Sequence, residues 1–287
     1  MSDRMSDRMS DRMLDKLAKI LRQAESAKGD EAEAFMQKAQ ELASTHAIDL
    51  AIARQHTAKR EQREQPTHKV IAIGAKGKQA NAHFIDLFRY IADVNDVKLN
   101  IANSNTWVIA FGFPSDIEVV ETLYASLVFQ MVESANAWLK TGEYKQERVW
   151  RKVTRKSRWG DRDTDEEYLP ITPQQARKNF YKGYADRVYH RLYNARAAAV
   201  VESMEREAKV LDEAGNSASP STELVLKAKA DEVKDYHATH STAKGTWKGS
   251  RIGTESRAAR SAGDDAGRTA RLGTAKAIGG SRTSIAA

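Results

Sequence analysis

The order in which strand patterns and helix patterns follow one another between residues 69 and 138 restricts the fold most. Three segments are rich in β-branched and aromatic residues: 69–73, 97–101 and 106–111. The last two are joined through Asn103-Ser-Asn105, a typical hairpin connection. Helical periodicity occupies 80–92 and resumes at Pro114. The order β-α-β-β-α predicts an α+β fold, with a small antiparallel or mixed sheet covered by helices.

Long helices are predicted on both sides of a charged segment. The helix that begins at Pro114 has Ser115 as its expected N-cap and Glu118 as the partner in a capping box. A second helix is expected to begin at Thr172-Pro173, an N-cap followed by proline, and to run to about residue 211. A further helix is expected over 222–237.

The chain divides into five expected regions. A repeated Met-Ser-Asp-Arg tetrapeptide suggests a disordered extension, and the next segment predicts a helical hairpin whose second helix ends near His46. A polar stretch closed by Pro66 is typical of a linker, and the glycines after residue 243 favour an extended basic tail. The expected regions are extension 1–12, small helical domain 13–53, linker 54–67, core domain 68–242 with a charged insertion near 143–170, and tail 243–287.

Charge is unevenly distributed along a chain whose formal net charge is +7. The tail after Ala243 holds nine cations and three acids, so the rest is nearly neutral. Basic segments of this kind meet phosphate or an acidic protein surface. The expected nucleic-acid contacts in the tail are Arg251, Arg257, Arg260, Arg268 and Arg271.

A second basic segment covers 145–158 and is followed at once by an acidic run, 161–167. Two interpretations remain open for it: a solvated exposed loop, or a surface that contacts a partner. The residues expected to contact a partner are Arg148, Arg151, Lys152 and Arg155.

Tyrosines and arginines interleave over 177–196. Phe180, Tyr184, Val188 and Leu192 recur every fourth residue, which is typical of a core-facing stripe. Tyrosine and arginine are also enriched at protein hot spots and stack on bases, although arginines alongside a packed helix commonly only snorkel. The partner contacts expected here are Tyr181, Tyr184, Arg187, Tyr189, Arg191 and Tyr193.

No constellation for catalysis is complete. The chain has no cysteine, which excludes disulfides, thiolate metal sites and cysteine nucleophiles. His237 and His240 have i,i+3 spacing but no evident third ligand, and Gly74-Ala-Lys-Gly-Lys78 lacks the order of a phosphate loop. We therefore expect a non-enzymatic protein without cofactor or metal.

No apolar run approaches the roughly 20 residues that cross a bilayer, and the N-terminus lacks the apolar stretch of a signal peptide. The sequence favours a soluble protein in the bacterial cytoplasm.

The N-terminal helical segments resemble a known family. The similar stretches are 16–27 (KLAKILRQAESA), 31–43 (EAEAFMQKAQELA) and 46–49 (HAID), and they resemble the domain of unknown function numbered 2786 of actinobacteria and their phages. Companion features of that family are similar in 111–116 (FGFPSD), 179–188 (NFYKGYADRV) and 266–273 (AGRTARLG).

Large recombination directionality factors of actinophages are similar to this type, and they bind a serine integrase and favour excision over integration. The resemblance implies that this chain is a phage regulator whose protein partner is a serine integrase on DNA, and that its own nucleic-acid contact is weak or indirect. A general nucleic-acid-binding protein that uses the tail, and a metal-dependent hydrolase, are the alternatives from other classes.

Overall fold

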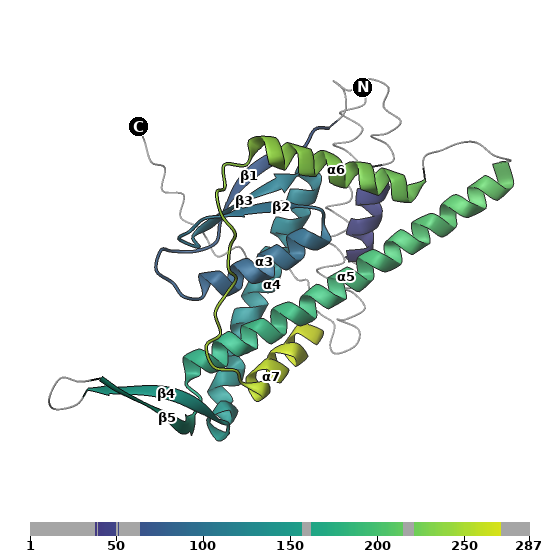
Figure 1. Cartoon of the computed structure of the whole chain (residues 1–287). Coiled ribbons are helices and arrows are strands. Elements are labelled where there is room, and N and C mark those ends of the chain that lie inside the picture. The colour runs from purple at the N-terminus through teal and green to yellow at the C-terminus, as the bar shows by residue number, and fades with distance from the viewer. Residues whose placement is uncertain are drawn as a thin grey trace, which may run out of the picture.

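A computed structural model describes residues 38, 40–49, 51, 64–156, 162–214 and 221–270 (Figure 1). Helices and strands mix within it, and the α+β prediction is confirmed. None of the helices in these ranges is long and apolar enough to cross a membrane. The predicted extension 1–12, most of the small helical domain and most of the linker lie outside the described residues.

The sheet has three antiparallel strands in the order β1-β3-β2: β1 Thr67–Ala72, β2 Lys98–Ile101 and β3 Trp107–Gly112. All three agree with the predicted strands to within two residues at each end. Because side chains alternate along a strand, Val108 and Ala110 turn towards the helices and are fully buried, whereas Trp107 faces the other way and is exposed. One face of the sheet is therefore built into the core.

Two helices cover that face. Helix α3 spans Asn81–Val94 and α4 spans Pro114–Thr141, and both contribute to a core that contains Phe88, Val120 and Leu123. The predicted cap of α4 is wrong: Phe113 occupies the N-cap position without a side-chain hydrogen bond. Pro114 at the first helical position removes one of the N–H groups that a helix start leaves unpaired, and its fixed φ suits the first turn.

Helix α5 spans Pro173–Ala214 and runs along the whole body, and α6 spans Thr222–His240 across its top (Figure 1). The predicted N-cap of α5 is confirmed, because the Thr172 hydroxyl accepts from the Gln175 amide at 3.3 Å. The Gln175 side chain accepts in return from the Thr172 N–H, which completes a capping box. Ser221 caps α6 in the same way.

The expected extended tail is wrong over twelve residues, which form helix α7, Arg257–Arg268. The Ser256 hydroxyl caps its first turn by accepting from the Ala259 N–H. Helix α7 lies against α5 (Figure 1), and its buried residues are Ala259, Gly263 and Gly267. Small side chains four residues apart let two helix backbones approach closely.

The charged insertion forms a short 3-10 turn, Glu143–Gln146, and a two-stranded hairpin of β4 Arg148–Lys156 and β5 Arg162–Pro170. This hairpin extends away from the rest of the molecule (Figure 1). The segment expected to be a solvated exposed loop is thus largely a strand, and most of its described side chains are exposed or half-buried.

The described part of the N-terminal segment is helical over 40–49 and packs Ala43, Ile48 and Ala51 out of solvent. The helix passes through His46, which was expected to end it. Ala43 belongs to the same core cluster as the sheet, so this segment docks on the body.

Candidate partner-binding site

Tyr181 and Tyr184 do not face a partner, and their expected role as contacts is wrong. Both are buried. Tyr184 lies on the stripe of every fourth residue that enters the core, and Tyr181 packs against His83 and Phe84 of α3, with ring centroids 6.1 and 5.8 Å away. Helix α5 is covered on two sides, by α3 and by α7, so a single apolar stripe underestimates its buried surface.

Arg187 and Arg191 hold α7 in place. The Arg187 guanidinium makes a bidentate pair with Asp264, with N–O distances of 2.8 and 2.7 Å, and this hydrogen bonding lowers the pKa of Asp264. Arg191 Nη1 donates to the carbonyl oxygen of Gly267 at 2.7 Å. A cation at the carbonyl end of a helix is favourable. The structure thus gives both arginines intramolecular contacts.

Two of the six expected contacts on α5 remain accessible. Tyr193 is 55% exposed. Tyr189 is half-buried and lies 4.8 Å from the Tyr90 ring and 6.1 Å from the Tyr193 ring. These rings form a small aromatic surface next to α3.

The β4–β5 hairpin carries a larger aromatic surface. Trp150 and Tyr168 are direct cross-strand partners, with ring centroids 5.4 Å apart, and they are 66% and 50% exposed. Arg148 donates to the Tyr168 carbonyl at 2.9 Å, and its guanidinium lies 5.7 Å from the Tyr168 ring centroid. Tryptophan, tyrosine and arginine are the residue types that dominate binding hot spots.

The hairpin also neutralises its own charge. The register places Lys152 opposite Glu166, and Arg155 forms an ion pair with Glu167 at 2.5 Å. The backbone of Arg151 lies opposite Glu167, and its side chain lies outside the described part. The predicted basic segment is therefore one strand of a mixed-charge ribbon, and its aromatic pair distinguishes it more than its net charge does.

The tail cations are divided between pairs and solvent. Arg260 pairs with Asp186 at 3.0 Å, and Arg268 contacts Asp264 at 3.4 Å. Arg251 and Arg257 are exposed, and Arg271 lies outside the described residues.

The histidine pair of α6 is divided between two neighbours. His237 Nε2 lies 2.8 Å from Asn100 Oδ1, and its ring meets Phe111 edge-on at 4.8 Å. His240 instead stacks on Tyr236 at 4.0 Å. Among the described residues no group of three or more potential metal ligands is found.

Residues 12–50 match the family described as "Protein of unknown function (DUF2786)". The predicted resemblance is confirmed over this stretch. No curated protein matches the chain, and no solved structure matches it. The similarity to the DUF2786 family thus covers residues 12–50 of the chain.

Proposed function

We propose that this protein is a non-enzymatic regulator that docks on a protein partner through the β4–β5 hairpin. The exposed Trp150–Tyr168 pair carries the proposal. A two-stranded hairpin that stands alone is marginally stable in water. Large aromatic side chains that are exposed together on such a hairpin are typical of a surface that binds a partner. A partner that covers the pair would remove its apolar surface from water, which favours binding.

The mixed charge of the hairpin favours a protein partner over duplex phosphate. Each cation of β4 from Arg151 to Arg155 lies opposite an acid of β5, so the ribbon has little net field to attract DNA. It offers an aromatic pair near its base and opposite charges paired across the strands beyond it, which suits a specific protein surface.

The sharpest form of the proposal takes a serine integrase as the partner, with the chain favouring excision over integration. It is supported by the resemblance to large actinophage directionality factors, and it rests on that analogy. The purified chain should bind integrase without DNA, promote attL × attR recombination and inhibit attP × attB recombination.

A double variant, Trp150→Ala with Tyr168→Ala, tests the hairpin. Each hot-spot truncation costs about 2 kcal/mol or more, so the affinity for integrase should fall at least about 100-fold, because roughly 1.4 kcal/mol is tenfold. Calorimetric titration measures it. Phe129→Ala is the matched control, because Phe129 is an exposed aromatic residue on α4, and its affinity should match the wild type.

Two outcomes would contradict different parts of the proposal. Integrase reactions that do not change when the wild-type chain is added would exclude the integrase. Integrase binding that survives the double variant would exclude the hairpin as the docking element.

A further inference from the structure

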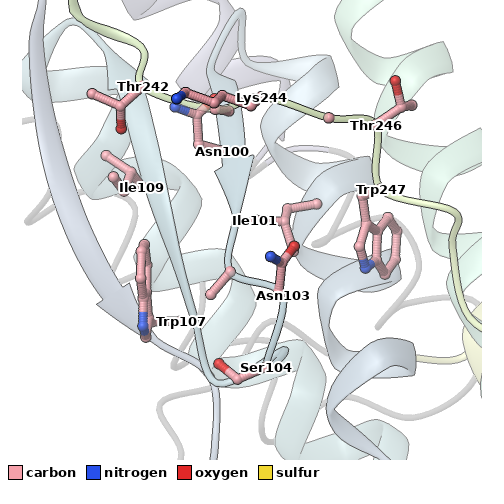
Figure 2. Close-up of a pocket in the computed structure, with 13 residues that line it drawn as sticks. Asn100, Ile101, Asn103, Ser104, Trp107, Ile109, Thr242, Lys244, Thr246 and Trp247 are labelled. Carbon is pink, nitrogen blue, oxygen red and sulfur yellow. The ribbon is translucent and has the colours of Figure 1, made fainter.

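Residues 241–256, here called the strap, leave the end of α6 and cross the edge of the sheet. Between the strap and strand β2 lies a groove of about 600 Å³ (Figure 2). This volume is within the roughly 300–1,000 Å³ range of ligand sites. The groove is formed by 100–104, Trp107, Ile109 and 242–247. It is separate from the hairpin of the proposed function.

Two tryptophans flank the groove (Figure 2). Trp247 is fixed: its indole Nε1 donates to Asn105 Oδ1 at 2.9 Å, and its ring packs against the core. Trp107 begins β3, and its carbonyl accepts from the Ala102 N–H at 3.2 Å, so its backbone is fixed. The Trp107 side chain is 41% exposed. The groove therefore offers a ring held on a rigid strand, with part of its surface free for stacking.

The strap is held in place from both sides of the groove. Asn100 Nδ2 donates to the Ser241 hydroxyl at 2.9 Å, and Asn100 Oδ1 contacts His237. The Asn100 side chain therefore holds the strap and the end of α6 on the sheet. Asn103 and Ser104 are exposed beside it (Figure 2). The Ser104 hydroxyl shares a 2.7 Å hydrogen bond with the Thr106 hydroxyl, so the Asn103 amide is the group that offers both donors and an acceptor to a ligand.

Positive charge surrounds the groove. The three segments that form or adjoin it are 68–80, 97–109 and 241–254, and together they hold seven lysines and arginines and no acid. The first segment adjoins the groove because the Ile73 N–H donates to the Thr106 carbonyl at 2.8 Å. Lys69 pairs with Glu121, and the other six cations are exposed: Lys76, Lys78, Lys98, Lys244, Lys248 and Arg251.

The charge of Lys98 also reaches His237, at the end of α6. Burial and the charge of Lys98 both lower its pKa. Lys98 therefore lies close enough to the end of α6 to act electrostatically on His237.

We propose that this groove binds a single strand of nucleic acid, with one base stacked on Trp107 and the phosphates along Lys98, Lys244 and Lys248. An aromatic platform beside a positive track is the arrangement by which single strands are held without sequence preference. A duplex is excluded from the same contact, because its bases are stacked on one another and expose no face to a tryptophan.

Fluorescence anisotropy with the full chain and a labelled 12-nucleotide thymidine strand tests the proposal. A uridine strand, a thymidine–adenine duplex and a polyglutamate competitor are measured in parallel. The wild type should bind both single strands at least 10-fold tighter than the duplex, and polyglutamate should compete poorly.

Substitutions at Trp107 test the stacking. Loss of one base–aromatic stack corresponds to a decrease in affinity of about 5-fold to about 150-fold, which is the change expected for Trp107→Ala. Trp107→Phe keeps a ring and should retain most of the affinity. Phe129→Ala removes an exposed aromatic residue of α4 that lies outside the groove and outside the hairpin, and it should leave the affinity unchanged.

Substitutions of lysines test the phosphate track. Lys98→Gln with Lys244→Gln removes two charges, so the slope of log affinity against log salt should become less steep by about 1.4. Lys209→Gln on the exposed surface of α5 is the control. Circular dichroism verifies that each variant is folded.

Three results would overturn the proposal: equal or tighter binding of the duplex, an unchanged affinity in folded Trp107→Ala, or no recovery in Trp107→Phe. Competition by polyglutamate as strong as by the strand itself would also overturn it and would assign the groove to an acidic protein segment.

Discussion

His83 lies in the interface of α3 and α5, where a charged imidazole is unfavourable. It is 3% exposed, and Nδ1 has no hydrogen-bond partner among the described residues. Burial, followed by the charges of Lys178 and Lys182, lowers its pKa to about 4. The folded chain therefore keeps the ring neutral at pH values where the unfolded chain protonates it.

This difference predicts a loss of stability in mild acid. Because the folded pKa is below the unfolded value of 6.5, the contribution is complete above pH 6.5 and is lost as the pH falls. At pH 5.5 the free energy of unfolding should be lower by about 1.4 kcal/mol from this group. Urea unfolding at pH 7.5 and 5.5 measures it. In His83→Gln the free energy of unfolding should differ less between the two pH values. An equal difference in the wild type and the variant would contradict the prediction.

Lys229 and Asp116 form a buried ion pair between α6 and the first turn of α4. Lys229 Nζ is 2.9 Å from Asp116 Oδ2, and the lysine side chain is 4% exposed. Asp96 is 3.6 Å from the same ammonium and pairs with Arg196 at 2.6 Å. Two cations and two carboxylates thus balance one another where α3, α4, α5 and α6 meet.

Truncating one member of this pair should be far more damaging than replacing both. Lys229→Ala leaves Asp116 buried without its main counter-ion and should lower the free energy of unfolding by about 3–5 kcal/mol. Lys229→Met combined with Asp116→Leu removes both charges and should cost much less than the single change. Urea unfolding of both variants measures this, and a double variant less stable than the single one would contradict it.

At the scale of elements, α5 and α7 pack at glycines. A Cβ added at Gly263 would lie 2.0 Å from the carbonyl oxygen of Phe180, and one at Gly183 would lie 2.0 Å from that of Arg260. Both neighbours are backbone atoms that cannot turn aside. Asn179, four residues before Gly183, donates to the Thr254 carbonyl and accepts from the Ser256 N–H, so one face of α5 binds the strap as well as α7.

Gly263→Ala should therefore separate the two helices, although alanine favours an isolated helix. We expect a loss of about 2 kcal/mol or more, which is typical of overpacking, and faster hydrogen exchange throughout 257–268. The matched control is Gly245→Ala, because a Cβ there would meet nothing within 4 Å. Equal exchange rates in α7 of both variants would contradict the close packing.

Periodicity predicted the elements that bury large apolar side chains and failed for those that do not. The three sheet strands, α3 and the start of α5 each combine an apolar pattern with a turn or cap. Helix α7 buries alanine and glycine, and its sequence signals are weak: the N-cap Ser256 and the spacing Ala259-x3-Gly263-x3-Gly267.

The hairpin was missed for a different reason. Its pattern is a basic run opposite an acidic run, and charge complementarity appears only once the strands are paired. The same limit applies to the site. Arg187 and Arg191 were expected to contact a partner, because no local pattern shows that they bind a helix some 75 residues later in the chain.

At the scale of the whole molecule, residues 241–270 connect parts that are distant in sequence. The strap contacts strand β2 through Ser241, and it contacts the β2–β3 turn at Asn105 through Trp247. Ser250 then donates to Asp86 of α3, and Ser256 donates to Glu147 at the base of the β4–β5 hairpin. The strap thus crosses the body before α7 packs on α5 (Figure 1).

This path predicts that the C-terminal region is structural up to residue 270. Deleting 244–287 removes Trp247, the Ser256 cap and α7. It leaves Arg187 without Asp264, and it removes the bonds of Asn179 with the backbone of Thr254 and Ser256. The loss of these mostly half-buried bonds, together with the packing of α7 on α5, should cost at least about 3 kcal/mol and lower the melting temperature by roughly 6 °C or more. Deleting 271–287 alone keeps every one of these contacts and should leave the melting temperature nearly unchanged.

Thermal unfolding of the two truncated chains decides between a structural and a dispensable tail. If both melt like the full chain, the docking of 241–270 does not stabilise the body and the prediction is wrong. If only the longer deletion melts early, a loss of nucleic-acid binding in that deletion reports unfolding as well as lost charge. The contribution of charge to nucleic-acid binding must then be measured with single substitutions at exposed positions such as Arg251 and Arg257. These variants keep the strap and α7.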